Sequence, residues 1–136
     1  YVHSKYKNLI SDLTGDFIID ALDYALEVPR AAPLTYSLGF NIDGNLGTWR
    51  SITRISYYHR DKSYYNENNQ GFINEQDILN FGYDIYSSDG KINIGIYGKN
   101  LSNEVKHGGD TNLSFGGTFA PLAKGKIVGA ELVYKF

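Results

Sequence analysis

Three arginines recur on one side of a single segment and could hold an anion. Arg50, Arg54 and Arg60 all occupy even-numbered positions, and side chains two residues apart point to the same side of an extended strand. A guanidinium group binds a carboxylate through two parallel hydrogen bonds. The arginines are therefore predicted either to bind an anionic ligand or another domain, or to form ion pairs with Asp84 and Glu131. We favour the ion pairs, and Arg54 and Arg60 stay candidate ligand-binding residues.

A second candidate binding segment spans residues 63–70, with the sequence SYYNENNQ. Tyrosine rings stack on flat ligand surfaces, and amide side chains both donate and accept hydrogen bonds. Tyr64, Tyr65 and Asn66 are accordingly predicted to contact a polar small-molecule ligand. The alternative is a loop tip that contacts only water.

A third segment combines carboxylates with the apolar residues Leu13, Phe17 and Tyr24. Its acidic residues are Asp12, Asp16, Asp20, Asp23 and Glu27. A calcium or cation site is one interpretation, but the spacing does not match the Asp-x-Asp-x-Asp-Gly pattern of an EF-hand loop. We favour a short amphipathic helix whose carboxylates form the solvated face.

The remaining residues predict neither an enzyme nor a metal or cofactor site. His3, His59 and His107 lie too far apart in the sequence to form a metal-binding pair, so we expect ordinary surface or lumen residues. The chain has no Cys, which excludes thiolate ligands and disulfides. No Ser-His-Asp spacing indicates a catalytic triad. The formal net charge of -2 comes without a basic run that would bind nucleic acid.

The elements that would position these residues are six strands of alternating apolar and polar residues. They are predicted at residues 1–9, 35–43, 48–60, 78–86, 91–99 and 127–136. The first has the weakest pattern and is assigned mainly by its place in the series. In the fifth, Ile92, Ile94 and Ile96 share one face, while Asn93 and Lys99 lie on the other.

The connections between the predicted strands alternate in length. Residues 44–47 and 87–90 form short turns, and the Asp-Gly pair that ends the second is a strong hairpin signal. The three other connections are long and span residues 10–34, 61–77 and 100–126. All short turns therefore lie at one end of the sheet, as in outer-membrane barrels with short periplasmic turns and long extracellular loops.

Composition permits a membrane barrel and excludes a membrane-spanning helix. No window approaches 18 consecutive apolar residues, and the mean hydropathy is -0.34. A barrel needs apolar side chains only at alternate strand positions. The aromatic residues are 12 Tyr, 7 Phe and 1 Trp, and Tyr suits the boundary between lipid and water. We predict an all-β fold that is an antiparallel transmembrane β-barrel segment, with a soluble β-sandwich binding domain or a small lipocalin-like barrel as the alternative.

Six strands are too few to close a membrane barrel, because the smallest bacterial members have eight. The chain also contains no Met and opens on Tyr1. We therefore expect it to be part of a longer barrel, as a fragment or a processed product.

Three short motifs resemble the closing region of TonB-dependent outer-membrane receptors. They are VPRAAP at 28–33, GKNLSNE at 98–104 and VYKF at 133–136. The first is similar to the Pro-Arg step before a strand of that family, and the second to its Lys-Asn-Leu box. The resemblance implies that residues 1–136 are the C-terminal portion of a barrel of about 22 strands. The plug domain and the TonB box would lie upstream.

The resemblance also implies an active transporter in the outer membrane of a Gram-negative bacterium. Such receptors import a scarce nutrient, such as an iron-siderophore, haem, cobalamin or an oligosaccharide, with energy from TonB. The implied partners are membrane lipid and lipopolysaccharide, the plug and the rest of the barrel, TonB, and the barrel-assembly machinery. That machinery would read Tyr134 and Phe136 as its signal. A passive porin and an outer-membrane barrel enzyme are the alternatives, and this segment does not specify the substrate.

Overall fold

The computed structural model describes residues 1–107, 111–113 and 117–136. The fold is all-β with antiparallel sheets, and 46% of its residues are in strands against 3% in a helix. The chain forms two compact units. The sheet unit comprises Tyr36–His59, Asp77–Val105 and Lys124–Phe136, and the loop unit comprises Tyr1–Thr35, Arg60–Gln76 and Lys106–Ala123.

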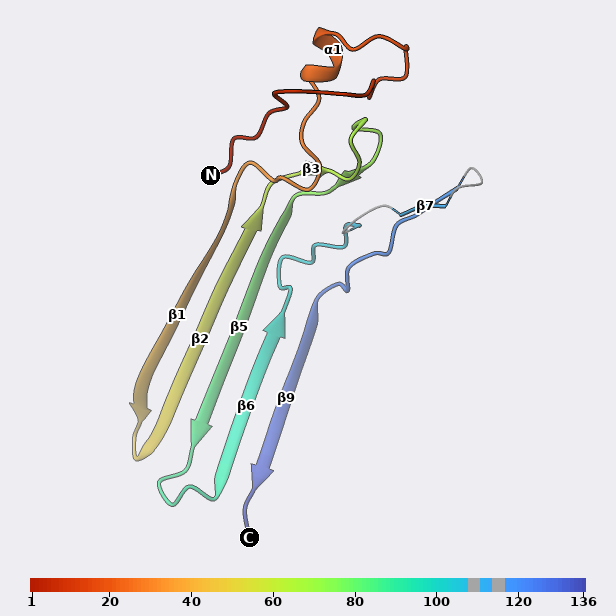
Figure 1. Ribbon diagram of the computed structural model, residues 1–136. Coiled ribbons are helices and arrows are strands. Elements are labelled where there is room, and N and C mark those ends of the chain that lie inside the picture. The colour runs from red at the N-terminus through yellow and green to blue at the C-terminus, as the bar shows by residue number, and fades with distance from the viewer. Residues whose placement is uncertain (108–110, 114–116) are drawn as a thin grey trace. The chain divides into compact units, whose positions relative to one another are not determined.

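Five strands form the main sheet, in the order β1-β2-β5-β6-β9 (Figure 1). They are β1 (Thr35–Leu46), β2 (Trp49–Arg60), β5 (Gln76–Tyr86), β6 (Ile92–Lys99) and β9 (Ile127–Tyr134). Each strand lies beside the one that precedes it in this list. β1 and β9 are therefore the outer strands, and the described residues form an open sheet rather than a closed barrel.

Both short turns of this sheet use glycine where the backbone requires it. Gly47 has φ 64° between β1 and β2, and Gly90 has φ 70° between β5 and β6. A residue without a Cβ adopts positive φ at no steric cost. The Gly90 N–H donates to the Ser87 carbonyl at 2.9 Å, which closes the second turn. The first turn is shorter than predicted, because β1 continues to Leu46.

The strand register confirms the predicted alternation of faces. Directly paired residues lie on the same face of a sheet. Ile94 of β6 pairs with Ile85 of β5 on one side and with Leu132 of β9 on the other. The next residue of β6, Gly95, pairs with Asp84 on the opposite face. The sheet thus has one mainly apolar face and one mainly polar face.

The apolar face of the sheet is not covered within the sheet unit. Phe40 is 61% exposed, Ile96 50% and Leu132 71%. Among the described side chains, Ile73 is the single buried hydrophobic residue, and it belongs to the loop unit. A soluble domain normally buries most of its large apolar side chains in a core. The sheet unit has no such core among its described residues.

The loop unit contains little regular structure. Its elements are α1 (Ala21–Tyr24), β3 (Ser63–Tyr64), β4 (Phe72–Ile73), β7 (Thr111–Leu113) and β8 (Gly117–Phe119). β3 pairs with β4 and β7 with β8, both antiparallel. No helix within the described ranges is long and apolar enough to cross a membrane.

The structure corrects two predictions for the N-terminal segment. Residues 1–9 form no strand, because their scattered Lys and His residues leave no continuous apolar face to pack. The main sheet accordingly has five strands and not six. The predicted amphipathic helix is reduced to the four residues of α1. Gly15 has φ 88° and Phe17 has φ 71°, and these left-handed conformations prevent the helix from extending toward the N-terminus of α1. Phe17 is 97% exposed.

Candidate functional site

Ion pairs occupy the polar face of the sheet. A side-chain nitrogen of Arg54 on β2 contacts the Asp84 carboxylate on β5, which confirms one of the predicted ion pairs. Arg50 pairs with Asp43 across the first hairpin, and its Nε lies 3.1 Å from both carboxylate oxygens. Arg60 belongs to the loop unit, where its Nη2 donates to the Asn74 carbonyl at 3.5 Å. The arginines thus mainly satisfy polar groups of the protein itself.

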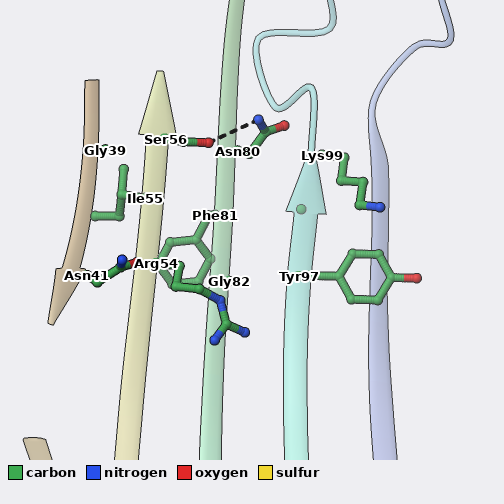
Figure 2. A pocket seen from close by; sticks show the side chains of 11 residues that line it. Gly39, Asn41, Arg54, Ile55, Ser56, Asn80, Phe81, Gly82, Tyr97 and Lys99 are labelled. Atoms are coloured by element: carbon green, nitrogen blue, oxygen red, sulfur yellow. Dashed lines mark hydrogen bonds between the residues drawn. The ribbon is translucent and has the colours of Figure 1, made fainter. Parts of the chain in front are cut away.

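An open hollow of about 660 Å³ lies on this polar face, in the half of the sheet where β2 and β6 end (Figure 2). Arg54 and Asn41 line it together with Tyr97 and Lys99. Ser56 and Asn80 also line it, and the Asn80 amide donates to the Ser56 hydroxyl at 3.1 Å. The volume is within the range of small-molecule sites, roughly 300–1,000 Å³. Of the predicted ligand-binding residues, Arg54 lines this hollow.

At the hollow, long side chains lie flat against the sheet because they pass over glycines of the neighbouring strand. The Arg54 side chain lies over Gly82, where an added Cβ would be 3.7 Å from the Arg54 Nε. The Tyr97 ring lies over Gly129, where an added Cβ would be 2.6 Å from the ring carbon Cζ. Figure 2 shows the Tyr97 side chain directed toward β9. Each glycine leaves room for a planar group to lie flat against the sheet.

Asp84 follows the same rule, since an added Cβ at Gly95 would be 2.7 Å from its Oδ1. These planar groups are still partly accessible. The Arg54 side chain is 50% exposed and that of Asp84 15%, and Tyr97 is 40% exposed. The Lys99 Nζ lies 5.8 Å from the centre of the Tyr97 ring. The hollow therefore offers hydrogen-bond donors and an aromatic ring, and the Asp84 carboxylate lies beside it as the ion-pair partner of Arg54.

The predicted tyrosine-rich site forms a hairpin of the loop unit. Tyr64 lies on β3, and the Lys62 Nζ is 5.3 Å from the centre of its ring. The Arg30 guanidinium lies 4.7 Å from the centre of the Tyr65 ring. The Asn66 side-chain oxygen accepts the N–H groups of residues 70 and 71, at 3.0 and 3.2 Å. These side chains hold the hairpin together, and Tyr64, Tyr65 and Asn66 are adjacent on it.

The acidic segment uses its carboxylates to organise the backbone. Asp23 is fully buried, and it accepts the N–H groups of Leu13 at 2.7 Å and of Thr14 and Asp20 at 2.9 Å. The N–H of Asp20, followed by those of Leu13 and Thr14, lowers the pKa of Asp23 from 3.8 to about 2. Asp12 accepts the N–H groups of Gly15 and Phe17. In the described ranges, no three His, Cys, Asp or Glu side chains are grouped to hold a metal ion.

His59 is more than an ordinary surface residue. Its Nδ1 lies 2.8 Å from the Asp77 carboxylate, and its ring stacks on Tyr36 with the centroids 4.9 Å apart. The Tyr57 hydroxyl also donates to Asp77. Sequence spacing could not reveal this cluster, because its members come from three different strands.

The loop after β6 contains a network of hydrogen bonds around Asn100, which the sequence did not predict. Asn100 is 7% exposed, and its side-chain amide donates to the carbonyls of Glu104 at 3.0 Å and Lys124 at 2.8 Å. Its backbone N–H donates to the Asn80 side chain at 2.9 Å. Asn100 and Asn103 have φ 50° and 57°. Two asparagines in a short polar stretch are the signal that could have predicted left-handed turns here.

Tyr134 and Phe136 lie at the end of β9, and their ring centroids are 5.1 Å apart in an edge-to-face arrangement. Leu132 is 71% exposed on the same face, and Phe136 is fully exposed. The two aromatic residues form a small apolar end to the outer strand.

Comparisons of the chain with protein-family models, with curated proteins and with solved structures found no match. The family resemblance therefore rests on the three sequence motifs.

Proposed function

We propose that the chain is a wall segment of a TonB-dependent outer-membrane transporter, which imports a scarce small-molecule nutrient. The observation that carries the proposal is the two-faced sheet. Its apolar face has no cover within the sheet unit, while its polar face holds ion pairs and a hollow. Lipid covers the first face in a membrane barrel, and water or a plug domain contacts the second.

Strand length supports a membrane-spanning wall. A strand needs about 9–11 residues to cross the hydrocarbon at a tilt of about 45°. β1 and β2 have 12 residues each and β5 has 11, whereas β6 and β9 have 8. Residues that flank the two shorter strands would complete their crossing.

The connections support the same proposal. The turns after β1 and β5 are short, and the longer connections leave the sheet from its opposite end. Outer-membrane barrels place short turns in the periplasm and long loops outside the cell. In the proposed barrel, the hollow therefore lies in the half that faces the cell exterior.

The outer strands require partners in this proposal. β1 and β9 each have one neighbour in the sheet, and an open edge within lipid would leave backbone N–H and C=O groups unpaired. Additional strands of the full barrel would pair with both. A soluble sandwich would instead need a second sheet against the apolar face, and the five main strands of the sheet unit belong to one sheet.

Single-cysteine labelling tests which face contacts lipid. The chain has no natural Cys, so Ile94→Cys and Asn93→Cys place one thiol on each face of β6 in a cysteine-free version of the native polypeptide. A water-soluble maleimide should label position 93 and spare position 94 in purified outer membranes. Equal labelling of both, or recovery of the polypeptide in the soluble fraction, would refute the membrane assignment.

Binding to TonB separates active import from a passive porin. The native polypeptide that carries this chain should bind the purified periplasmic domain of TonB in a pull-down, and ligand should strengthen that binding. A porin would show no binding and would conduct ions steadily in a planar bilayer.

The proposal assigns Tyr134 and Phe136 to the signal for barrel assembly. Phe136→Asp should reduce the amount of polypeptide inserted into the outer membrane, measured by heat-modifiable migration. Lys135→Asp is the matched control, because it changes the neighbouring residue. Unchanged insertion of Phe136→Asp would remove Phe136 from the signal.

A further inference from the structure

We propose that the hollow on the polar face binds a saccharide, with one sugar ring against Tyr97. This inference rests on the proposed function, which makes the polar face the inner wall of a transporter. It adds the chemical class of the ligand, which the sheet geometry alone leaves open.

The polar groups of the hollow match hydroxyl groups. Arg54 donates hydrogen bonds, and its guanidinium is held in place by the ion pair with Asp84 beside the hollow. Asn80 and Ser56 line the hollow and can both donate and accept. A sugar hydroxyl also donates and accepts. Adjacent hydroxyls of one ring can therefore bind donor and acceptor groups at the same time.

The charges of the hollow favour a neutral ligand. The charge of Arg54 is compensated by its ion pair with Asp84, so an anionic ligand gains little from it, while Lys99 would repel a cationic ligand. A neutral polyhydroxyl compound meets no such repulsion. It can also keep the existing ion pair, so neither partner is left uncompensated.

The Tyr97 ring provides the apolar contact that a sugar ring needs. Its ring packs over Gly129 and is still 40% exposed. The C–H groups on one side of a sugar ring form a flat apolar surface that stacks on an aromatic face. The Lys99 Nζ lies 5.8 Å from the centre of the Tyr97 ring and can donate to a hydroxyl of the bound sugar. The flat Arg54 group, which lies over Gly82, adds a second platform.

Isothermal titration of the purified native polypeptide in detergent tests this inference. The probes are maltohexaose, cellohexaose, xylohexaose and chitohexaose, with ferrichrome as a probe of another ligand class. At least one sugar should bind. Tyr97→Ala should weaken that binding by about tenfold or more, whereas Tyr97→Phe should keep most of it because the ring stays.

Tyr86→Ala is the matched control, because Tyr86 lies on the polar face at the other end of β5. It should leave sugar binding unchanged. Arg54→Lys should weaken binding by roughly tenfold, since lysine keeps the charge and loses the planar fork.

Three outcomes would overturn the inference. They are no binding of any of the four sugars, equal losses for Tyr97→Ala and Tyr86→Ala, and binding of ferrichrome alone. Each would leave the proposed transport function intact if the polypeptide fractionates with the outer membrane and binds TonB. Recovery in the soluble fraction would refute that function independently of the titration.

Discussion

The sheet unit and the loop unit are held in place by different kinds of hydrogen bond. In the sheet unit, backbone groups of neighbouring strands pair with one another over long stretches, as between β6 and β9. In the loop unit, and in the loop after β6 that belongs to the sheet unit, single side chains bind backbone groups outside any strand pairing. The Asn69 side chain, for example, both accepts from and donates to the backbone of Glu27, at 2.8 and 2.9 Å. A repeated pattern specifies the strands, and individual residues specify the loops.

This difference predicts how each unit responds to substitution. A strand residue should matter through the face on which it lies, so that its neighbour in the sequence gives the opposite result. A loop residue should matter through the particular N–H or C=O group that it binds. The following variants test both halves of the contrast.

The largest effect is expected from a charge on the apolar face. Ile94→Arg should lower the free energy of unfolding by about 2–4 kcal/mol if the residue lies near the middle of the bilayer. Asn93→Arg, one residue away on the polar face, should change it little. Urea unfolding of the native polypeptide in lipid vesicles measures both. Equal losses would contradict the assignment of the two faces.

Among polar residues outside the strands, Asn100 should give the largest loss of stability when it is substituted. Asn100→Ala removes a side chain that joins the carbonyls of Glu104 and Lys124, and alanine tolerates the left-handed backbone at φ 50° less well than asparagine does. The buried groups left unpaired should lower the free energy of unfolding by about 1–3 kcal/mol. Asn100→Gly should lose less than Asn100→Ala, because glycine tolerates the backbone conformation. The reverse order would show that the backbone conformation is not a factor.

Adding a methyl group tests the glycines over which long side chains lie, here called the glycine floor (Gly82, Gly95 and Gly129). Gly129→Ala places a Cβ 2.6 Å from the far end of the Tyr97 ring, and because this part-exposed ring can shift, the loss should be about 0.5–1.5 kcal/mol, the cost of an off-rotamer side chain. Gly39→Ala is the control, because the nearest atom to its added Cβ is 4.0 Å away. A second change, Tyr97→Ala, should recover most of the loss at 129. Failure of this recovery would place the clash elsewhere.

The smallest effect should be local and should depend on pH. The pKa of Asp23 is lowered from 3.8 to about 2, so its stabilising contribution is complete above about 3.8 and is lost as pH falls through about 2. The protection factors of the amides of residues 12–24, taken against the intrinsic exchange rate at each pH, should fall over that interval, while the amides shared by β6 and β9 stay protected. Asp23→Asn should accelerate the same exchange already at neutral pH. Simultaneous loss of protection in both units would show that they open together.

The sheet was largely predictable because it repeats. Alternation identified all five main strands, and register confirms the shared face of Ile85, Ile94 and Leu132. The Arg54–Asp84 ion pair was also predicted, since both residues lie on the polar face of their strands. Alternation assigns a side chain to a face of the sheet, but it could not predict toward which neighbouring strand that side chain is directed. The cover of Gly95 by Asp84 and of Gly129 by Tyr97 therefore appears only in the structure.

The loop unit was mostly not predictable because its contacts do not repeat. The carboxylates near α1 were assigned to the wet face of a helix, yet Asp23 is buried and binds three N–H groups. Short polar side chains compete with helical hydrogen bonds in this way. The strand predicted at residues 1–9 does not form, for a related reason. Its alternation is weak, and in the described part of the chain it has no neighbouring strand with which to form backbone hydrogen bonds. The predicted roles of Tyr64, Tyr65 and Asn66 in ligand binding stay predictions.

The glycine floor also constrains how this sequence can change over evolutionary time. A larger residue at 129 is compatible with the fold only if residue 97 shortens or turns away, and positions 95 and 84 are linked in the same manner. Each pair should therefore change together between related sequences, as correlated substitutions across neighbouring strands. Divergent relatives could be recognised by these linked pairs even where the individual residues differ.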